Sequence, residues 1–228
     1  MIKIERSRIQ KDNILKNAYW LFKQKGYTNT TTREIADVCG IKRGLLHYYY
    51  KQKEDILSDL YTDMLEGMRT YLEEEAKPEV GGLAYIALFN NFFFKVVSSF
   101  RFLHNLLYDV LDSKSLKRIK IENTMRLYQK VYEDFKIPVT DQALFIATAV
   151  AVGSEAELLL NAFDGNLQVS FEALARIINR AEFSMLDVKA DSLTEMLDAA
   201  EKAVENLSPD DFAAYFKNVY AWSCDAGD

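Results

Sequence analysis

Cysteine, histidine, proline and glycine are all scarce in this sequence of 228 residues, which contains 2, 2, 3 and 9 of them respectively. The two cysteines, Cys39 and Cys224, lie far apart in the chain and do not make a disulfide framework. Little glycine and proline beside long periodic apolar stretches favours an all-helical protein. At 49% hydrophobic residues, the chain can bury one sizeable core or two moderate ones.

The sequence also lacks the residue patterns of an enzyme. Its two histidines occur in different contexts, and it has no Cys-His or Ser-His-Asp spacing, no Gly-rich phosphate loop and no cluster of metal ligands. We therefore expect no catalytic site, no metal and no cofactor. No signal peptide is recognised, and the longest apolar run, Ala143 to Gly153, is too short to span a bilayer. The expectation is a cytoplasmic protein without a membrane segment.

The net charge of −6 is unevenly distributed along the chain. Residues 1–53 hold 12 Lys and Arg against 4 Asp and Glu, a balance of +8, whereas the remaining residues hold 16 against 30, a balance of −14. Charge runs are often only solvated surface. Here the positive excess indicates a nucleic-acid-binding head, because neutralisation of phosphates dominates affinity for DNA.

The segment from residue 30 to residue 56 predicts two short helices joined by a tight turn. Thr31 and Glu34 have the spacing of a capping box at the start of the first helix. Gly40 ends that helix at a position where a positive φ is expected, and the second helix begins two or three residues later. Two helices joined by such a turn form a helix-turn-helix, which places its second helix in the DNA major groove.

This segment resembles the TetR family of bacterial transcriptional regulators. The family pattern has a Thr-rich start, an I-A-x-x-x-G helix, a G-V-S-x-G-x-L-Y-x-Y-F recognition helix and an S-K-E-x-L continuation. The chain reads TTREIA at residues 31–36, GIKRGLLHYYY at 40–50 and QKEDI at 52–56. It departs from the pattern at Lys42, where the family has a capping Ser, and at His47, where the family has a phosphate-contacting Tyr.

The expected fold is all-α, with about 9–11 helices in two parts. Residues 1–53 form a three-helix DNA-binding head, and residues 54–228 form a larger helical body for ligand binding and dimerisation. Residues 1–11 are a basic arm that either reaches the phosphate backbone or frays, and the first helix spans residues 11–25. The later helices are expected at about 53–75, 83–99, 101–112, 114–136, 140–163, 171–186, 192–207 and from 209 onward.

Nine residues of the head are the predicted DNA contacts: Thr31, Thr32, Arg33, Lys42, Arg43, Leu45, His47, Tyr48 and Lys53. The first three lie at a helix N-terminus, where N–H groups and hydroxyls bind phosphate. Arg43 opens the recognition helix and can make a bidentate contact with guanine, while Leu45 can contact a thymine methyl group. The resemblance implies a phosphate contact for Lys53. The alternative for His47 is a surface histidine without a role.

The body offers candidates for a small-molecule site. Residues 83–112 are rich in aromatic side chains, and an apolar pocket with a few polar groups is the usual form of such a site. The alternative is that most of these aromatic side chains are ordinary core. The predicted ligand-binding residues are Phe89, Phe93, Phe100, His104, Tyr108 and Arg126.

The segments 140–163 and 171–186 are the predicted dimer interface. The first carries a run of small residues that allows another helix to approach closely, and the resemblance implies a four-helix bundle across a two-fold axis. A buried helix pair within one chain is the alternative. A two-fold dimer would require a palindromic operator.

The C-terminal part, residues 192–222, contains two further predicted helices. Ser192 and Glu195 have the spacing of a second capping box, and Ser208 followed by Pro209 announces the last helix. These helices either extend the dimer interface or cover the pocket.

Together these features predict a ligand-responsive, sequence-specific homodimer, a repressor that a small apolar or aromatic effector releases from a palindromic operator. The resemblance implies that the helix at about 53–75 transmits ligand binding to the spacing of the two heads. The alternative is a DNA-binding protein whose body binds a protein partner instead of a small molecule. An apolar cavity in the body would distinguish the two.

Overall fold

The computed structural model describes residues 2–76, 80–186 and 190–220, and within these ranges it consists of helices without a β-strand. The all-α expectation is confirmed. The head comprises α1 (Ile2–Lys25), α2 (Thr32–Val38) and α3 (Arg43–Tyr49). The body comprises α4 (Lys53–Thr70), the π-helical turn η1 (Tyr71–Ala76), α5 (Leu83–Ser99), α6 (Arg101–Asp112), α7 (Lys114–Asp134), α8 (Asp141–Phe163), α9 (Phe171–Ser184), α10 (Ala190–Glu205) and α11 (Pro209–Tyr220).

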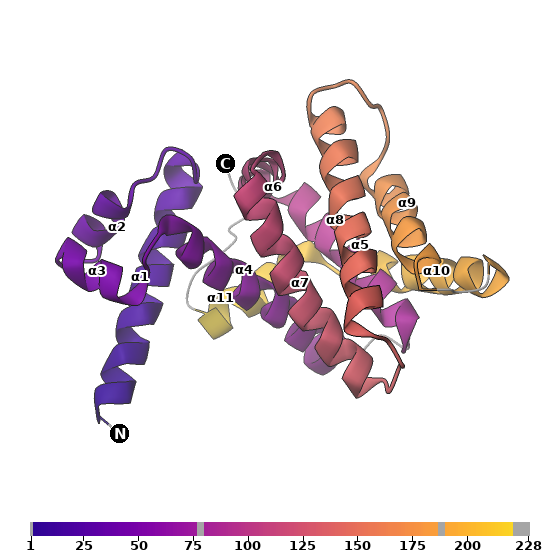
Figure 1. The fold of residues 1–228 in the computed structure, drawn as a ribbon, viewed down its shortest axis with the longest axis horizontal. Helices are drawn as coiled ribbons and strands as arrows, with labels where there is room; N and C mark the ends of the chain where they lie inside the picture. The colour runs from indigo at the N-terminus through magenta and orange to yellow at the C-terminus, as the bar shows by residue number, and fades with distance from the viewer. Residues whose placement is uncertain (1, 77–79, 187–189, 221–228) are drawn as a thin grey trace.

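The three helices of the head lie at one side of the molecule, and α4 leads from them into the body (Figure 1). One face of α1 carries Ile14, Ala18, Leu21 and Phe22, which are all buried, as their helical spacing predicts. Helix α1 packs against α2 and α4, and α2 packs against α3. The buried residues of the head therefore continue into the body as one apolar core, which α1 and α4 share.

Helix α1 begins nine residues earlier than the sequence predicts. The supposed basic arm is helical from Ile2, because residues 2–25 contain no proline or glycine and are rich in Lys, Arg, Gln and Glu, which favour helices. The next long helix, α4, was expected to reach about residue 75, but its α-helical part ends at Thr70 and the chain continues as the π-helical turn η1. Tyr71 and Leu72, consecutive residues of this turn, are both buried.

Helix α5 runs through the body and packs against α4, α6, α9, α10 and α11. Eleven of its seventeen residues are buried, and its bounds match the expected range. Phe100 separates α5 from α6, and the two helices are bent by 113° relative to each other. This bend determines which face of α6 packs toward the interior of the body.

By length and composition alone, α8 could cross a membrane, and α5 with α6 could form one bent span. The core helix of a water-soluble protein passes the same test. Helix α8 packs against α6, α7 and α9, and 44% of its most apolar window is buried within the structure. Its apolar character is therefore weak evidence for a membrane.

The C-terminal helices differ from the prediction at one end. Helix α10 is already helical at Ala190, so Ser192 lies inside the helix and the predicted capping box with Glu195 is wrong, since a capping residue must be extended. The start of α11 is as predicted, because the Ser208 hydroxyl accepts a hydrogen bond from the Asp211 backbone N–H at 3.2 Å. Trp222 and Cys224 lie outside the described residues.

Candidate functional site

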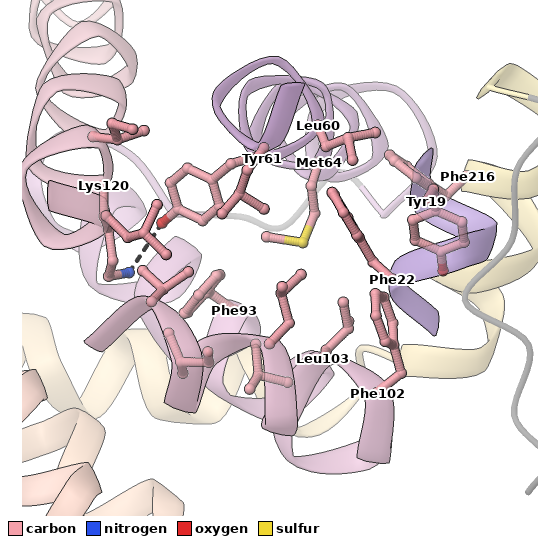
Figure 2. Close-up of a pocket in the computed structure, with 17 residues that line it drawn as sticks. Tyr19, Phe22, Leu60, Tyr61, Met64, Phe93, Phe102, Leu103, Lys120 and Phe216 are labelled. Atoms are coloured by element: carbon pink, nitrogen blue, oxygen red, sulfur yellow. Dashed lines mark hydrogen bonds between the residues drawn. The ribbon is translucent and has the colours of Figure 1, made fainter. Parts of the chain in front are cut away.

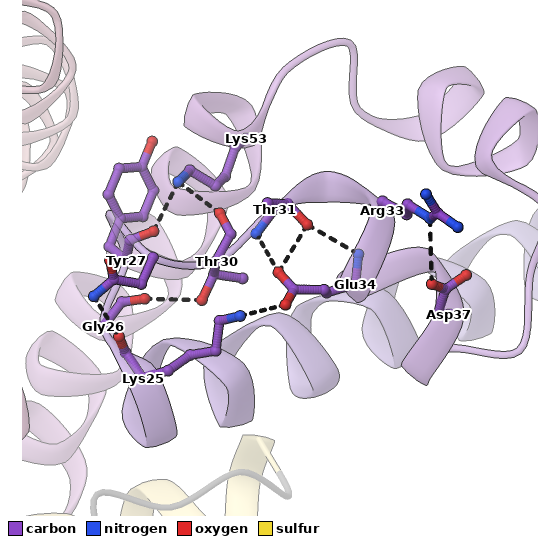
Figure 3. Close-up of polar contacts among 10 residues, drawn as sticks. Lys25, Gly26, Tyr27, Thr30, Thr31, Arg33, Glu34, Asp37 and Lys53 are labelled. Carbon is purple, nitrogen blue, oxygen red and sulfur yellow. Dashed lines mark hydrogen bonds and ion pairs between the residues drawn. The ribbon is translucent and has the colours of Figure 1, made fainter.

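The start of α2 is held by the predicted capping box. The Thr31 hydroxyl accepts from the Glu34 backbone N–H at 3.2 Å, and Glu34 Oε2 accepts from the Thr31 N–H at 2.8 Å (Figure 3). Lys25, at the end of α1, pairs with the same carboxylate. The hydrogen bonds from Lys25 and then from Thr31 lower the pKa of Glu34 to about 2. The Thr31 side chain is thus engaged in fixing α2 to α1.

The turn between α2 and α3 sets the direction of the second helix. Gly40 has a φ of +66°, which only glycine adopts without strain, and the Ile41 N–H donates to the Ala36 carbonyl oxygen at 3.0 Å. Leu46 then points inward from α3 and is buried. The helix-turn-helix geometry expected from the sequence is present.

The outer face of α3 is exposed. Tyr48 is 76% exposed and Leu45 41% exposed, and Lys42, Arg43 and His47 are exposed as well. Lys42 occupies the N-cap position, and its side chain makes no capping hydrogen bond with the described residues. The five predicted contacts at the recognition helix therefore share an accessible surface.

The glycine of this face is Gly44. A Cβ added there would meet no heavy atom within 4 Å among the described residues. A partner could therefore approach the α3 backbone closely at this point, a feature that the sequence analysis did not single out.

The remaining predicted contacts lie at the two flanks. Thr32 is half-buried at the first position of α2, whereas Arg33 is exposed with its Nε 3.9 Å from Asp37 Oδ2 (Figure 3). Both residues belong to the first turn of α2, next to its capped start.

Lys53 has a different environment from the one that the resemblance implies. Its ammonium group donates to the carbonyl oxygens of Tyr27 at 2.7 Å and Thr30 at 2.8 Å and lies 4.1 Å from the centre of the Tyr27 ring (Figure 3). Burial lowers the pKa of Lys53, with Glu54 opposing. Lys53 thus ties the loop after α1 to the start of α4, and two of its three N–H groups are not available to a phosphate. No local sequence pattern could predict this contact, because the two acceptors lie on a loop more than 20 residues away in the chain.

A cavity lies between the head and the body. The space in it that the centre of a water molecule can occupy has a volume of about 50 Å³. Its lining side chains are apolar apart from Lys120 and two tyrosines, Tyr19 and Tyr61. Two of its lining residues belong to α1 and so to the head. Figure 2 labels Tyr19, Phe22, Leu60, Tyr61, Met64, Phe93, Phe102, Leu103, Lys120 and Phe216 from α1, α4, α5, α6, α7 and α11.

The amino-terminal residues 14–60 match the family model of bacterial regulatory proteins, tetR family. This match coincides with the helix-turn-helix and with the α1 face that supports it. This match places the helix-turn-helix head in the TetR family.

Similar proteins agree with this assignment. The probable HTH-type transcriptional regulator YttP of Bacillus subtilis is 36% identical over 66 residues, which are 29% of this chain and 32% of that protein. The biofilm operon icaADBC HTH-type negative transcriptional regulator IcaR of Staphylococcus epidermidis is 46% identical over 46 residues, which are 20% of this chain and 25% of that protein. The chain thus matches about a third or less of the length of these relatives.

The likeness to solved structures extends over the body. A TetR transcriptional regulator from Rhodococcus sp. RHA1 aligns with 80% of this chain and 98% of its own at a TM-score of 0.61 and 15% identity. The structure of RolR without ligand aligns with 83% of this chain and covers 95% of its own, at a TM-score of 0.54 and 17% identity. At this identity the likeness shows the fold alone: the body is a TetR-type helical body.

The cavity includes one of the six predicted ligand residues, Phe93. Phe89 lines a second, smaller cavity that adjoins it. The other four predicted residues line neither of these two cavities: Phe100, His104, Tyr108 and Arg126.

The orientation of α6 and α7 explains where three of these side chains lie. His104 and Tyr108 face α8, where their rings lie 4.1 and 5.9 Å from that of Phe163, and Arg126 is exposed on α7. Helix α6 presents its opposite side to the cavity through Phe102 and Leu103. The bend at Phe100 determines which side of α6 faces the cavity. Helical periodicity alone could not predict this orientation.

An apolar surface is present on α8 and α9, the helices predicted to form the dimer interface. Phe145 is 52%, Ile146 44% and Ile177 50% exposed. Helices α8 and α9 pack against each other, so these side chains belong to neighbouring helices. Gly153 also lies on the exposed side of α8, and a Cβ added there would meet no described atom within 4 Å.

Within residues 2–76, 80–186 and 190–220, no group of three His, Cys, Asp or Glu side chains could hold a metal ion.

Proposed function

We propose that this chain is a sequence-specific DNA-binding transcriptional regulator that acts as a homodimer, most simply as a repressor. The observation that carries the proposal is the exposed outer face of α3, with Arg43 at its first position, on a head with a charge balance of +8. The relative IcaR is named a negative regulator, which supports repression.

In this proposal residues 1–53 are the DNA-binding domain, and its side chains divide into three roles. Arg43 reads a base edge, with Leu45, His47 and Tyr48 beside it on α3. Thr32, Arg33 and Lys42 approach phosphates at the helix starts. Thr31 and Lys53 are positioning residues, because their polar groups are engaged within the head.

Residues 54–228 form the dimerisation and ligand-binding body. The exposed side chains Phe145, Ile146 and Ile177 support a two-fold interface made of α8 and α9 from both copies, because an uncovered apolar surface of this kind marks an interaction site. Such a dimer would require a palindromic operator.

The apolar cavity supports a small-molecule effector rather than a protein partner. At about 50 Å³ the cavity is smaller than the engineered cavity of about 150 Å³ that admits benzene, so its walls must part to admit a ligand. Tyr19 and Phe22 in α1 and Leu60 and Met64 in α4 form part of these walls. Parting them moves the head relative to the body, and the ligand favours the state that does not fit the operator by its difference in affinity between the two states.

The experiment is selection of tightly bound duplexes from random DNA, followed by sequencing. We expect a palindrome whose half-site centres are separated by about 10–10.5 base pairs or a multiple of that spacing. Absence of an enriched sequence, with binding that depends only on salt, would contradict sequence-specific regulation.

A further inference from the structure

The main cavity is adjoined at one end by a second cavity, and a common wall separates them. Three side chains line both cavities: Tyr61, Phe93 and Lys120. In Figure 2 Lys120 and Tyr61 lie at one end of the group of lining side chains, and Tyr19 and Phe216 lie at the other. The second cavity has a volume of about 30 Å³ on the same measure and contains more polar groups.

The charge of Lys120 is already paired. Its ammonium group lies 3.1 Å from Glu155 Oε2, donates to the Tyr61 hydroxyl at 2.9 Å and sits 4.5 Å from the centre of the Phe93 ring. Burial by itself lowers the pKa of Lys120, but Glu155 and Tyr61 outweigh it and raise that pKa above its ordinary value. Lys120 is therefore an ammonium ion at neutral pH.

Glu155 is only partly satisfied. It is 5% exposed, and its second oxygen, Oε1, is buried without a hydrogen-bond partner among the described residues. The buried Thr124 hydroxyl has no such partner in the described structure either, and both side chains line the second cavity. A buried carboxylate oxygen without a donor is costly, so a donor at this point would be bound strongly.

The size of the second cavity limits what this donor can be. A space of about 10–15 Å³ on this measure accommodates one water-sized group, so about 30 Å³ leaves room for one or two such groups and not for a ring. The bulk of a ligand must therefore occupy the apolar main cavity, with one small group extending past Lys120.

The charges of the site select among small groups. An anionic group would be repelled by the Glu155 carboxylate, and a cationic group would be repelled by the Lys120 ammonium. Neither would find a free counter-ion, because Lys120 and Glu155 are already paired with each other. A hydroxyl group suits both sides, because it donates to Glu155 Oε1 and accepts from the Thr124 hydroxyl.

We infer that the effector is an uncharged apolar molecule with a hydroxyl group at one end, which Glu155 and Thr124 bind beyond the common wall. This inference rests on the proposed function only in taking the cavity as the effector site. The hydroxyl-binding subsite itself is a property of the folded body and can be tested without DNA.

The first test is calorimetric titration of the full chain at pH 7 with three probes of similar size: 4-ethylphenol, ethylbenzene and 4-ethylbenzoate. We expect 4-ethylphenol to bind about tenfold or more tightly than ethylbenzene, since a hydrogen bond to a charged group is worth about that factor. 4-Ethylbenzoate should bind more weakly than either. Equal binding of the phenol and ethylbenzene, tightest binding of the benzoate, or binding of none of the three would overturn the inference.

Two isosteric variants locate the effect. Thr124→Val removes the hydroxyl in the second cavity but leaves the Lys120–Glu155 pair, and it should reduce the preference for 4-ethylphenol about fivefold. Thr148→Val is the matched control: its hydroxyl is also buried without a partner in the described structure, but Thr148 lines neither cavity. An unchanged preference in Thr124→Val, or an equal loss in both variants, would contradict the assignment.

A third variant tests Glu155 without leaving a lone buried charge. Lys120→Met/Glu155→Leu replaces the pair with apolar side chains of similar size, a change that folded proteins tolerate. It should bind ethylbenzene at least as tightly as 4-ethylphenol. Retention of the wild-type preference would show that the hydroxyl binds elsewhere.

Failure of this inference can be told apart from failure of the proposed function. If random-DNA selection yields a palindrome but the phenol shows no preference, only the hydroxyl subsite is refuted. If the phenol binds as expected but no DNA sequence is enriched, the hydroxyl subsite is supported and the proposed function as a sequence-specific regulator is refuted.

Discussion

The head and the body use polar side chains in opposite ways. At the start of α2 in the head, the contacts are local and partly exposed: Thr31 and Glu34 are three residues apart, and Glu34 meets Lys25 nine residues back. In the body they are buried and distant in sequence, as between Lys120 and Tyr61, 59 residues apart. The head thus fixes its helices with side chains that leave the α3 face free, whereas the body withdraws ionisable groups from water, where each must be paired with an opposite charge or stay uncharged.

The difference predicts how each region responds to the loss of one partner. An exposed ion pair contributes little, because water solvates whichever partner remains. A buried ion loses several kcal/mol of solvation, so its remaining partner cannot be left alone.

The largest effect is expected at the buried pair. Lys120→Met leaves Glu155 without its counter-ion, and the free energy of unfolding should fall by about 3–5 kcal/mol in urea denaturation. Arg118→Met is the matched control on the same helix, since Arg118 pairs with Glu122 in an exposed position, and it should cost about 0.5 kcal/mol or less. Similar losses in both variants would abolish the distinction between buried and exposed pairs.

A second prediction concerns the carboxyl group of Glu182, which is buried beside Asn90. Burial raises the pKa of Glu182 to about 8, against 4.5 for a free glutamate, so the folded state binds the extra proton between these values. The free energy of unfolding should therefore decrease as pH rises from about 4.5 to about 8, by up to about 1.4 kcal/mol per pH unit.

Glu182→Gln keeps the shape and should remove this slope, which urea denaturation at several pH values would measure. In the head, Glu34 gives stability a pH dependence of the opposite sign. Its pKa is lowered to about 2, so its contribution to the free energy of unfolding is present above pH 4.5 and is lost as pH falls toward 2. A Glu182→Gln variant with the wild-type slope would refute the protonated Glu182.

The same contrast explains what the sequence could predict. The Thr31–Glu34 cap, the Gly40 turn and the bounds of α5 depend on neighbouring residues, and they were predicted correctly. Lys53 and Lys120 depend on partners brought close only by the fold, so Lys53 was assigned to phosphate and Lys120 was not singled out. Helical spacing identifies an apolar face but not its partner, and the predicted ligand residues on α6 therefore point to α8 instead of the cavity.

The outer surfaces of the two regions also differ, since the body presents an apolar patch where the head presents a basic one. Phe145→Glu places a charge on the proposed α8–α9 interface and should raise the dimer dissociation constant by about 100-fold or more, as seen by sedimentation equilibrium. Ile9→Glu, at an exposed residue of α1, is the control and should leave the dimer intact. A wild-type dissociation constant in Phe145→Glu would move the interface elsewhere.

The basic surface of the head can be divided by the kind of contact that each side chain makes. Arg43→Ala should lower discrimination between the selected operator and random DNA by about 1–3 kcal/mol, because the proposed role of Arg43 is to read a base. Lys53→Ala, by contrast, should lower the melting temperature while the slope of affinity against salt stays unchanged. An equal loss of affinity on both DNAs for Arg43→Ala would assign that residue to phosphate.

The smallest effect is expected at Gly44, where stability and binding should move in opposite directions. The site is helical with open space around it, so Gly44→Ala should raise the free energy of unfolding by about 0.5–1 kcal/mol through helix propensity alone. The added methyl group lies on the α3 face proposed to enter the groove and should weaken operator binding more than binding to random DNA. A variant that is more stable and binds the operator unchanged would mean that the α3 backbone does not approach DNA closely at this position. Equal weakening on both DNAs would indicate contact with the phosphate backbone instead of the bases.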